Sequence, residues 1–292
     1  MPAGKLLSVT DSAGMLIRLN KLFRPVEHPF NLESDGRQKY CEWEFERGES
    51  TLKLYLDSRK CGSDRHMFTG KELLDVGAGG GGKSLYYLTR GAKRVCAMDI
   101  VENYRDEALA YAQRLGLDKK FSYSVADAAE MPFEDSSFDV VIMNDAMEHV
   151  RPPEKVISEV RRVLREGGRL YINFPPYGHP FGAHLSEVIS IPWVHLFFDE
   201  ETLIKEYKEL CGEIDDRDMR ISFRISKNSL GEEYFSYINK LTIKRFNEII
   251  NQSRMKKVYY KEIPLRSFLS PVAKLPVTKD WFVRSVVCIM EK

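Results

Sequence analysis

A glycine-rich stretch, residues 73–84 (LLDVGAGGGGKS), constrains the fold of this chain more than any other feature. A short apolar run ends at Val76, and five glycines then fall within residues 77–82. Glycine lets the backbone turn tightly and approach a ligand without a Cβ in the way. A helix N-terminus after such a turn offers free N–H groups to a bound ligand. The stretch therefore predicts a buried strand, a tight turn and a helix, the unit from which nucleoside-binding α/β folds are built.

Apolar runs alternate with amphipathic segments on both sides of this turn. The predicted strands are residues 72–76, 94–100, 121–127, 138–145, 169–175, 256–264 and 281–292. The predicted helices are residues 83–91, 102–116, 153–168 and 241–254. Continuous apolar runs are typical of strands buried on both faces. Their alternation with helices predicts an α/β fold with a mostly parallel, doubly wound sheet.

The regular alternation covers only part of the chain. We predict an N-terminal helical extension (1–70), a ligand-binding core (71–176), an insertion (177–240) and a C-terminal part of the core sheet (241–292). The insertion is rich in aromatic residues and histidine and follows the fifth strand. Ligands bind beyond the carboxyl ends of the strands in open α/β sheets. We therefore expect this segment, called the lid insertion below, to form a lid over a substrate pocket.

The composition gives no strong preference for nucleic acid or membrane. Hydrophobic residues make up 43% of the chain, charged residues 30%, and the net charge is +1, so no overall charge favours a polyanion. The apolar runs are too short to span a bilayer. Residues 12–26 predict a short basic amphipathic helix, either packed on the domain or lying on a membrane surface. Five widely spaced cysteines without a C-x-x-C pair lead us to expect a reducing, cytoplasmic location.

Three nucleotide-site patterns fit the glycine turn. Residues 77–82 have the G-x-G-x-x-G spacing of dinucleotide sites, and residues 77–84 have the phosphate-loop spacing of NTPases. Residues 75–81 have the D-x-G-x-G-x-G spacing of the first motif of S-adenosylmethionine (SAM) methyltransferases. Asp75 lies where a carboxylate would repel phosphates but suits the ammonium and sulfonium groups of SAM. Asp99, at the end of the second predicted strand, suits the ribose of either NAD or SAM.

The downstream segments separate these alternatives. Residues 125–133 (VADAAEMPF), 138–150 (FDVVIMNDAMEHV) and 163–175 (VLREGGRLYINFP) follow the turn in order. Over residues 70–176 the chain resembles the class I SAM-dependent methyltransferases, in the branch that includes ubiquinone/menaquinone-biosynthesis enzymes. The resemblance extends weakly to residues 241–292. It implies SAM as the cofactor and a Rossmann-like, seven-stranded, mostly parallel sheet with an antiparallel last strand.

The resemblance implies a role for the residues of the turn. Gly77 and Gly79 would let the main chain pass the methionine part of SAM without a Cβ clash. Ala78 lies between them, where the family often has Cys or Ser. Asp75 would organise the loop and face the ammonium group of SAM.

Residues after the next three strands would hold the rest of the cofactor. Asp99 would accept hydrogen bonds from both ribose hydroxyls, and Ile100 would pack on the adenine face. Asp127 would accept from the adenine amino group, while the backbone N–H of Ala128 would reach a ring nitrogen. Asn144 would bind the methionyl amine. An aspartate that ends a strand is also a common helix cap, so the motif series carries these assignments.

The lid insertion supplies the predicted acceptor side. His179 is the candidate general base for an acceptor that must lose a proton. Tyr177, His184, Trp193 and His195 are candidate substrate contacts. The alternative is that these residues pack the lid onto the sheet.

A metal site is a further possibility at Asp145-x-x-Glu148-His149. It resembles the Glu-x-x-Glu-His metal site of certain RNA and quinone-pathway methyltransferases, and a later histidine such as His179 would complete it. A Glu-His pair at this point also occurs in family members that use no metal, and we expect no metal here.

These observations predict a SAM-dependent methyltransferase acting on a small, partly apolar molecule by in-line methyl transfer to oxygen, nitrogen or carbon. An RNA or tRNA methyltransferase is one alternative and would need a basic surface stripe. A non-catalytic SAM-binding partner subunit is the other. The sequence makes no prediction of oligomeric state.

Overall fold

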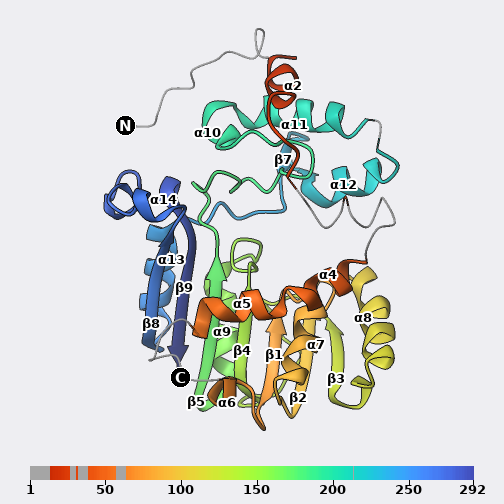
Figure 1. Ribbon diagram of the computed structural model, residues 1–292, viewed down its shortest axis with the longest axis vertical. Coiled ribbons are helices and arrows are strands. Elements are labelled where there is room, and N and C mark those ends of the chain that lie inside the picture. Colours follow the sequence, from red (N-terminus) through yellow and green to blue (C-terminus); the bar gives the residue numbers. More distant parts are fainter. Residues whose placement is uncertain (1–13, 27–30, 32–38, 57–63, 213) are drawn as a thin grey trace.

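The computed structural model describes residues 14–26, 31, 39–56, 64–212 and 214–292, and its core is a seven-stranded sheet (Figure 1). The strands are β1 (Glu72–Val76), β2 (Arg94–Asp99), β3 (Phe121–Val125), β4 (Phe138–Asn144), β5 (Leu164–Phe174), β8 (Lys256–Pro264) and β9 (Val283–Glu291). Their order is β3-β2-β1-β4-β5-β9-β8. Only β9 pairs antiparallel, with both β5 and β8. The predicted seven-stranded, mostly parallel sheet with an antiparallel last strand is confirmed.

Helices cover both faces of the sheet. One face carries α5 (Gly48–Leu56), α7 (Gly82–Thr89) and α8 (Asn103–Arg114), with α4 (Tyr40–Glu46) packed on α7. The other face carries α9 (Pro153–Val163) and α13 (Ile243–Gln252). In α9 the buried residues are Val156, Ile157, Val160 and Val163, a single stripe at helical spacing. Apolar side chains of the helices therefore cover both faces of the sheet. A ligand-binding site can form only at the ends of the strands.

The lid insertion forms a separate layer beyond the carboxyl ends of the parallel strands (Figure 1). It contains α10 (Val194–Phe197), α11 (Glu200–Leu210), α12 (Arg217–Arg224), β6 (Ile225–Lys227) and β7 (Glu233–Phe235). The N-terminal helix α2 (Met15–Asn20) packs into the apolar core of this layer through the fully buried Leu16. The described part of the predicted 12–26 amphipathic helix thus packs on the domain. The N-terminal extension therefore divides between α2 on the lid and α4 and α5 on the core.

One predicted boundary is wrong. The helix expected over 153–168 ends at Val163, and β5 begins at Leu164. Leu164 is fully buried and pairs with Phe138, after which the register shifts before Arg169 pairs with Val140. Burial of Leu164 in the sheet therefore outweighs the local helical pattern.

The remaining described elements are short. They are α6 (Asp64–Met67), η1 (Asp118–Lys120), η2 (Ser267–Leu269), η3 (Val272–Lys274) and α14 (Lys279–Phe282). Within the described ranges, no helix has both the length and the apolar character needed to cross a membrane.

Candidate functional site

A cavity of about 630 Å³ lies between the carboxyl ends of the strands and the lid insertion. Small-molecule sites typically measure roughly 300–1,000 Å³. The lining residues are Tyr40, Gly77, Gly79, Met98, Asp99, Ile100, Val101, Tyr104, Ala126, Asp127, Ala128, Asp145, Ala146, His149, Val150, Arg151, Ser222, Phe223, Ser226, Ser236 and Tyr237. We call the part before residue 152 the core wall and the part from residues 222–237 the lid wall.

The glycine turn gives the core wall its shape. Gly77 has a φ of 71°, in the left-handed region that favours glycine. A Cβ at this position would lie 2.6 Å from the Cβ of Ala146. Gly79, with a φ of 54°, also lines the cavity, and its carbonyl accepts a hydrogen bond from the Tyr123 hydroxyl (2.6 Å). The backbone therefore carries no side chain at Gly77 and Gly79, where a ligand would approach it.

The rest of the glycine run serves packing against α4. A Cβ on Gly82 would lie 1.9 Å from the carbonyl oxygen of Cys41 and 2.6 Å from the amide nitrogen of Phe45. The Gly82 N–H donates to Oε2 of Glu44 (3.1 Å), a buried carboxyl whose pKa burial raises to about 8. The unusually long run of glycines therefore lets a helix from the N-terminal extension close over the turn.

Asp75 lies beneath the turn and does not line the cavity. It is buried and accepts a hydrogen bond from the Ser84 hydroxyl (2.6 Å), and burial raises its pKa to about 6. The neighbouring Lys83 faces the carboxyl groups of Glu44, Asp75 and Asp145, which raise its pKa despite the opposing effect of burial. The Asp75 carboxylate thus joins the end of β1 to the start of α7 through Ser84, and its role toward SAM stays a prediction. Lys83 and Ser84, the pair that suggested a phosphate loop, both interact with carboxyl groups of the protein itself.

Asp99 lies at the end of β2 and lines the cavity. Its Oδ2 accepts from the Gly79 N–H (2.9 Å) and its Oδ1 from the Val101 N–H (3.0 Å). Burial raises the pKa of Asp99. Each carboxylate oxygen can accept a second hydrogen bond, so the carboxylate is fixed in place and still able to receive two hydroxyl groups.

The residues predicted to hold the adenine also line the cavity. Asp127 is oriented by accepting the Ala129 N–H at Oδ1 (2.8 Å), and Ala128 lies beside it. Ile100 is 69% exposed and lines the cavity. An apolar side chain open to the cavity offers a surface on which a flat ring can pack.

Asn144 does not line the cavity. Its Oδ1 accepts a hydrogen bond from the Tyr55 hydroxyl (2.6 Å), and its Nδ2 donates to the Tyr87 hydroxyl. The Asn144 side chain, predicted to bind the methionyl amine, therefore makes its hydrogen bonds beneath the cavity. The next residue, Asp145, lines the cavity with a φ of 48° and is held by a hydrogen bond from Asn173 Nδ2 (2.8 Å).

The lid wall combines two aromatic rings with the hydroxyl groups of Ser222, Ser226 and Ser236, and a buried ion pair supports it from behind. The rings of Phe223 and Tyr237 lie 4.7 Å apart. Behind them Arg224 lies 4.9 Å from the Tyr237 ring centroid, and its Nε lies 2.5 Å from Oε1 of the buried Glu187. Tyr207 also donates to Glu187 (2.8 Å). No sequence pattern marks these residues, because each is brought to the cavity only by the folding of the lid insertion.

Four of the residues predicted for the acceptor side lie outside the cavity. Tyr177, His179, Trp193 and His195 do not line it. The Tyr177 carbonyl meets His195 Nε2 at 2.7 Å, and burial lowers the pKa of both His195 and His179 to about 4. Trp193 Nε1 donates to the Trp281 carbonyl (3.3 Å). These contacts fit the alternative reading, in which the residues join the base of the lid insertion to the sheet.

His184 instead joins the residues that suggested a metal site. Single ligand atoms of Glu148, His149 and His184 all lie within 4.8 Å of one another. Neither Asp145 nor His179 belongs to this group. His149 lines the cavity, and burial lowers its pKa to about 4 while raising the pKa of Glu148 well above its usual range.

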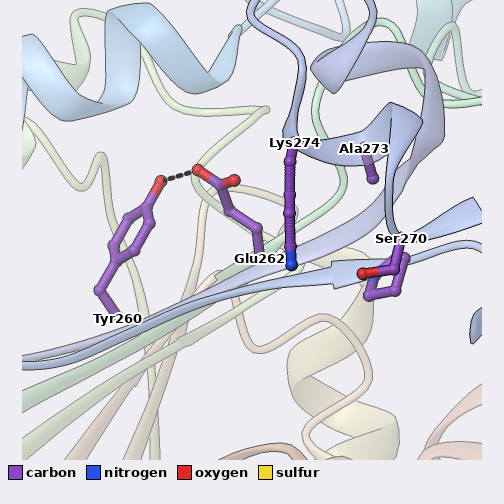
Figure 2. A pocket seen from close by; sticks show the side chains of 6 residues that line it. Tyr260, Glu262, Ser270, Ala273 and Lys274 are labelled. Carbon is purple, nitrogen blue, oxygen red and sulfur yellow. Dashed lines mark hydrogen bonds between the residues drawn. The ribbon is translucent and has the colours of Figure 1, made fainter.

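A smaller cavity of about 250 Å³ lies at the edge of the sheet, lined in part by β8 residues up to Pro264, the last residue of that strand (Figure 2). It lies between β8 and the short helices η2 and η3. In Figure 2 the Tyr260 hydroxyl donates to Glu262 (2.9 Å), with Ser270 and Lys274 nearby. None of the residues predicted from the sequence lines it, and it is separate from the glycine turn.

Comparison with known proteins identifies the core. Residues 74–172 match a family described as the methyltransferase domain. Residues 74–172 form a methyltransferase domain. This confirms the resemblance to SAM-dependent methyltransferases predicted from the motifs, and with it SAM as the cofactor of the domain. The match includes the glycine turn, Asp99 and Asp127 of the core wall, and ends before the lid insertion.

Curated relatives match over the same part of the chain. Sterol 24-C-methyltransferase ERG6B of Gibberella zeae is 38% identical over 99 residues, covering 34% of this chain and 26% of that protein. 27-O-demethylrifamycin SV methyltransferase of Amycolatopsis mediterranei is 36% identical over 101 residues, covering 35% and 37%. The ubiquinone/menaquinone biosynthesis C-methyltransferase UbiE of Roseobacter denitrificans is 33% identical over 104 residues, covering 35% and 42%. The matches thus span a quarter to two fifths of these relatives' lengths.

Solved structures share the fold of the methyltransferase domain over more of the chain. A geranyl diphosphate methyltransferase in complex with SAM has a TM-score of 0.52 at 15% identity, covering 85% of this chain and 84% of that one. The [4+2]-cyclase SpnF has a TM-score of 0.53 at 14% identity, covering 96% and 94%. At such identities the likeness shows the fold alone, and a fold does not fix a reaction.

Proposed function

We propose that this protein is a SAM-dependent methyltransferase that methylates a small, partly apolar molecule. The observation that carries the proposal is that the core wall and the lid wall line one cavity. The core wall offers the bare glycine turn and the fixed carboxylates of Asp99 and Asp127, which fit a cofactor with a ribose and an adenine. The lid wall offers Phe223 and Tyr237, which fit an acceptor with an apolar part.

Bound SAM supplies an electrophilic methyl group on a sulfonium, so the protein has mainly to align the reactants and exclude water. The glycine turn and Asp99 fix the donor end of the cavity. Phe223 and Tyr237 fix the acceptor end and keep it apolar. The glycine turn, Asp99 and Asp127 would hold SAM, which would supply the methyl group to the acceptor atom.

Three observations support a small acceptor over RNA. The net charge of +1 gives no general attraction for a polyanion. The lid wall presents two aromatic rings to a cavity of about 630 Å³. The relatives described above are named for methylation of a sterol, of a demethylrifamycin and in ubiquinone/menaquinone biosynthesis.

The test is a binding and turnover experiment with the full chain. Calorimetry should detect binding of SAM and S-adenosylhomocysteine but not of ATP or NAD. Phenols, quinols, sterols and RNA are then each added with SAM. We expect S-adenosylhomocysteine to be formed with one class of the small molecules and not with RNA. Binding of ATP or NAD in place of SAM would overturn the cofactor assignment. Binding of SAM with turnover only on RNA would overturn the acceptor assignment.

A further inference from the structure

Exposed apolar side chains gather in the connection between β8 and β9. This connection, residues 265–282, contains η2, η3 and α14 and is called the edge loop below. Its large exposed apolar side chains are those of Phe268 (76% exposed), Leu275 (53%), Val277 (84%) and Trp281 (42%). Single exposed apolar residues are ordinary on protein surfaces, whereas a group of them marks an interaction surface. The edge loop is therefore a candidate docking surface.

The edge loop is folded and anchored to the core. The Thr278 hydroxyl donates to the Val272 carbonyl (2.7 Å), and the Trp281 N–H donates to the Thr278 carbonyl (3.0 Å). Ala273 of η3 is buried in the apolar core of the sheet. The loop therefore keeps its exposed apolar side chains on the outside while its own polar groups and its small residue are turned inward.

The exposed charges of the edge loop are positive. Arg266 and Lys274 are its only exposed charged residues, and neither forms an ion pair with a residue that the structure describes. Asp280, the only acid in the loop, is partly buried and accepts the Ile243 N–H (3.2 Å). Apolar side chains beside unpaired positive charges complement an anionic lipid surface, because headgroups attract the charges and the interface takes up the apolar groups.

The edge loop lies at the same end of the sheet as the large cavity. β9 pairs antiparallel with both β5 and β8, so β5 and β8 end at the same edge of the sheet. That edge carries the lid insertion (Figure 1). The lid insertion also contacts the loop, since the ring of Trp193 lies 6.1 Å from that of Phe282. A surface bound by the edge loop would therefore lie beside the lid.

We propose that the edge loop docks this protein onto the surface of an anionic lipid membrane. The four exposed apolar side chains would enter the interface between headgroups and acyl chains, a depth that tryptophan favours. Arg266 and Lys274 would contact the lipid phosphates. One consequence rests on the proposed function: a partly apolar acceptor that dissolves in lipid would be concentrated beside the lid. The docking itself does not depend on that function.

The test is co-sedimentation of the full chain with two kinds of vesicle, phosphatidylcholine alone and equal parts of phosphatidylcholine and phosphatidylserine. We expect the wild type to bind the mixed vesicles, to bind pure phosphatidylcholine much more weakly, and to lose affinity as salt is raised. Phe268→Ser with Val277→Ser should weaken binding to the mixed vesicles by more than tenfold. Arg266→Gln with Lys274→Gln should weaken it about fivefold for each charge removed.

Two matched controls change exposed residues elsewhere. Leu230→Ser alters a side chain that is 81% exposed in the turn between β6 and β7, and Lys119→Gln alters an exposed lysine on η1, next to β3 at the opposite edge of the sheet. Both should bind like the wild type. All the substituted side chains are exposed, so we expect unchanged melting temperatures, and each double variant tests the surface independently of the other.

No binding to the mixed vesicles, or equal binding by the wild type and both double variants, would overturn the docking surface. Equal wild-type binding to the two kinds of vesicle would overturn its preference for anionic lipid. Self-association without lipid that Phe268→Ser with Val277→Ser abolishes, and no vesicle binding, would assign the surface to a second copy of this chain instead. S-adenosylhomocysteine affinity is measured on the same samples. Vesicle binding without S-adenosylhomocysteine binding would leave the docking surface standing and overturn the proposed function.

Discussion

The two walls of the cavity are built in opposite ways. Most of the core wall consists of residues at or just after the ends of strands, shaped by backbone geometry at Gly77 and by hydrogen bonds at Asp99, and Tyr40 of α4 completes it. The lid wall consists of side chains brought together by the packing of α12, β6 and β7, and held by the buried pair of Arg224 and Glu187. The first wall is mostly local in sequence, and apart from Tyr40 it lies within residues 74–172, which match the methyltransferase domain. The second depends on tertiary structure and lies outside the matched domain.

This difference explains which site residues could be predicted from the sequence. Asp99 and Asp127 follow apolar strands in a recognisable motif, and both line the cavity. Phe223 and Tyr237 have no local signal, because neither periodicity nor spacing tells which face of a short helix or loop will meet the core. The prediction that His179 is the base relied on its closeness in sequence to the fifth strand, but the structure places His179, half-buried, outside the cavity.

The largest expected effect is a loss of stability in the lid wall that leaves the core sheet unchanged. Arg224→Met would leave the buried Glu187 carboxylate without its partner, and losing one member of a buried pair typically costs about 3–5 kcal/mol. We expect hydrogen exchange to accelerate in residues 183–237 while β1 and β4 keep their protection. Replacing both partners, as Arg224→Met with Glu187→Leu, should recover part of the loss.

Arg217→Met, an exposed arginine on the same helix, is the control and should exchange like the wild type. Uniform acceleration through the sheet would contradict the separation of the two walls, because it would mean that the lid and the core unfold together.

A pH effect is expected from Glu44, which lies on α4 against the glycine turn and behind the core wall. The folded pKa of Glu44 is raised to about 8, against an ordinary value of 4.5. The folded state therefore holds a proton that the unfolded state has released, so stability should fall as pH rises from about 4.5 to about 8, by a few kcal/mol in order of magnitude. Glu44→Gln should lose most of this slope, being close to the wild type at pH 5 and more stable at pH 8.

The measurement is the free energy of unfolding in urea at several pH values. Glu49→Gln, which changes an exposed carboxylate on α5, should keep the wild-type slope. A Glu44→Gln variant that is less stable than the wild type at pH 8 would show that the carboxylate is stabilised as an anion in the folded protein.

A smaller effect is expected at the glycine run. Gly82→Ala should destabilise the protein by about 1–3 kcal/mol, the usual cost of overpacking, because the added Cβ meets backbone atoms of α4 that cannot move independently. Thermal denaturation provides the measurement. Thr89→Ala, a surface change on the same helix, should stay within about 0.5 kcal/mol of the wild type. An unchanged melting temperature for Gly82→Ala would mean that α4 does not close over the turn.

The strands and helices of the core could be predicted largely from apolar runs, since each buried strand is a continuous apolar segment and each helix is an amphipathic one. The prediction was wrong where a tertiary contact competes, as at Leu164, which joins the sheet instead of extending α9. The interior of the lid insertion could not be predicted, because its short helices and two-stranded sheet are stabilised by one another and by α2, which is distant in sequence.

The central claim is that the core wall binds the cofactor and the lid wall binds the acceptor. It is tested most directly by calorimetric titration of S-adenosylhomocysteine into Asp99→Ala and Phe223→Ala side by side. We predict that Asp99→Ala weakens the affinity by more than tenfold, since hydrogen bonds to a charged group contribute about 1.5–3 kcal/mol, and that Phe223→Ala leaves it within about twofold of the wild type. Unchanged affinity in Asp99→Ala, or an equal loss in both variants, would contradict this account.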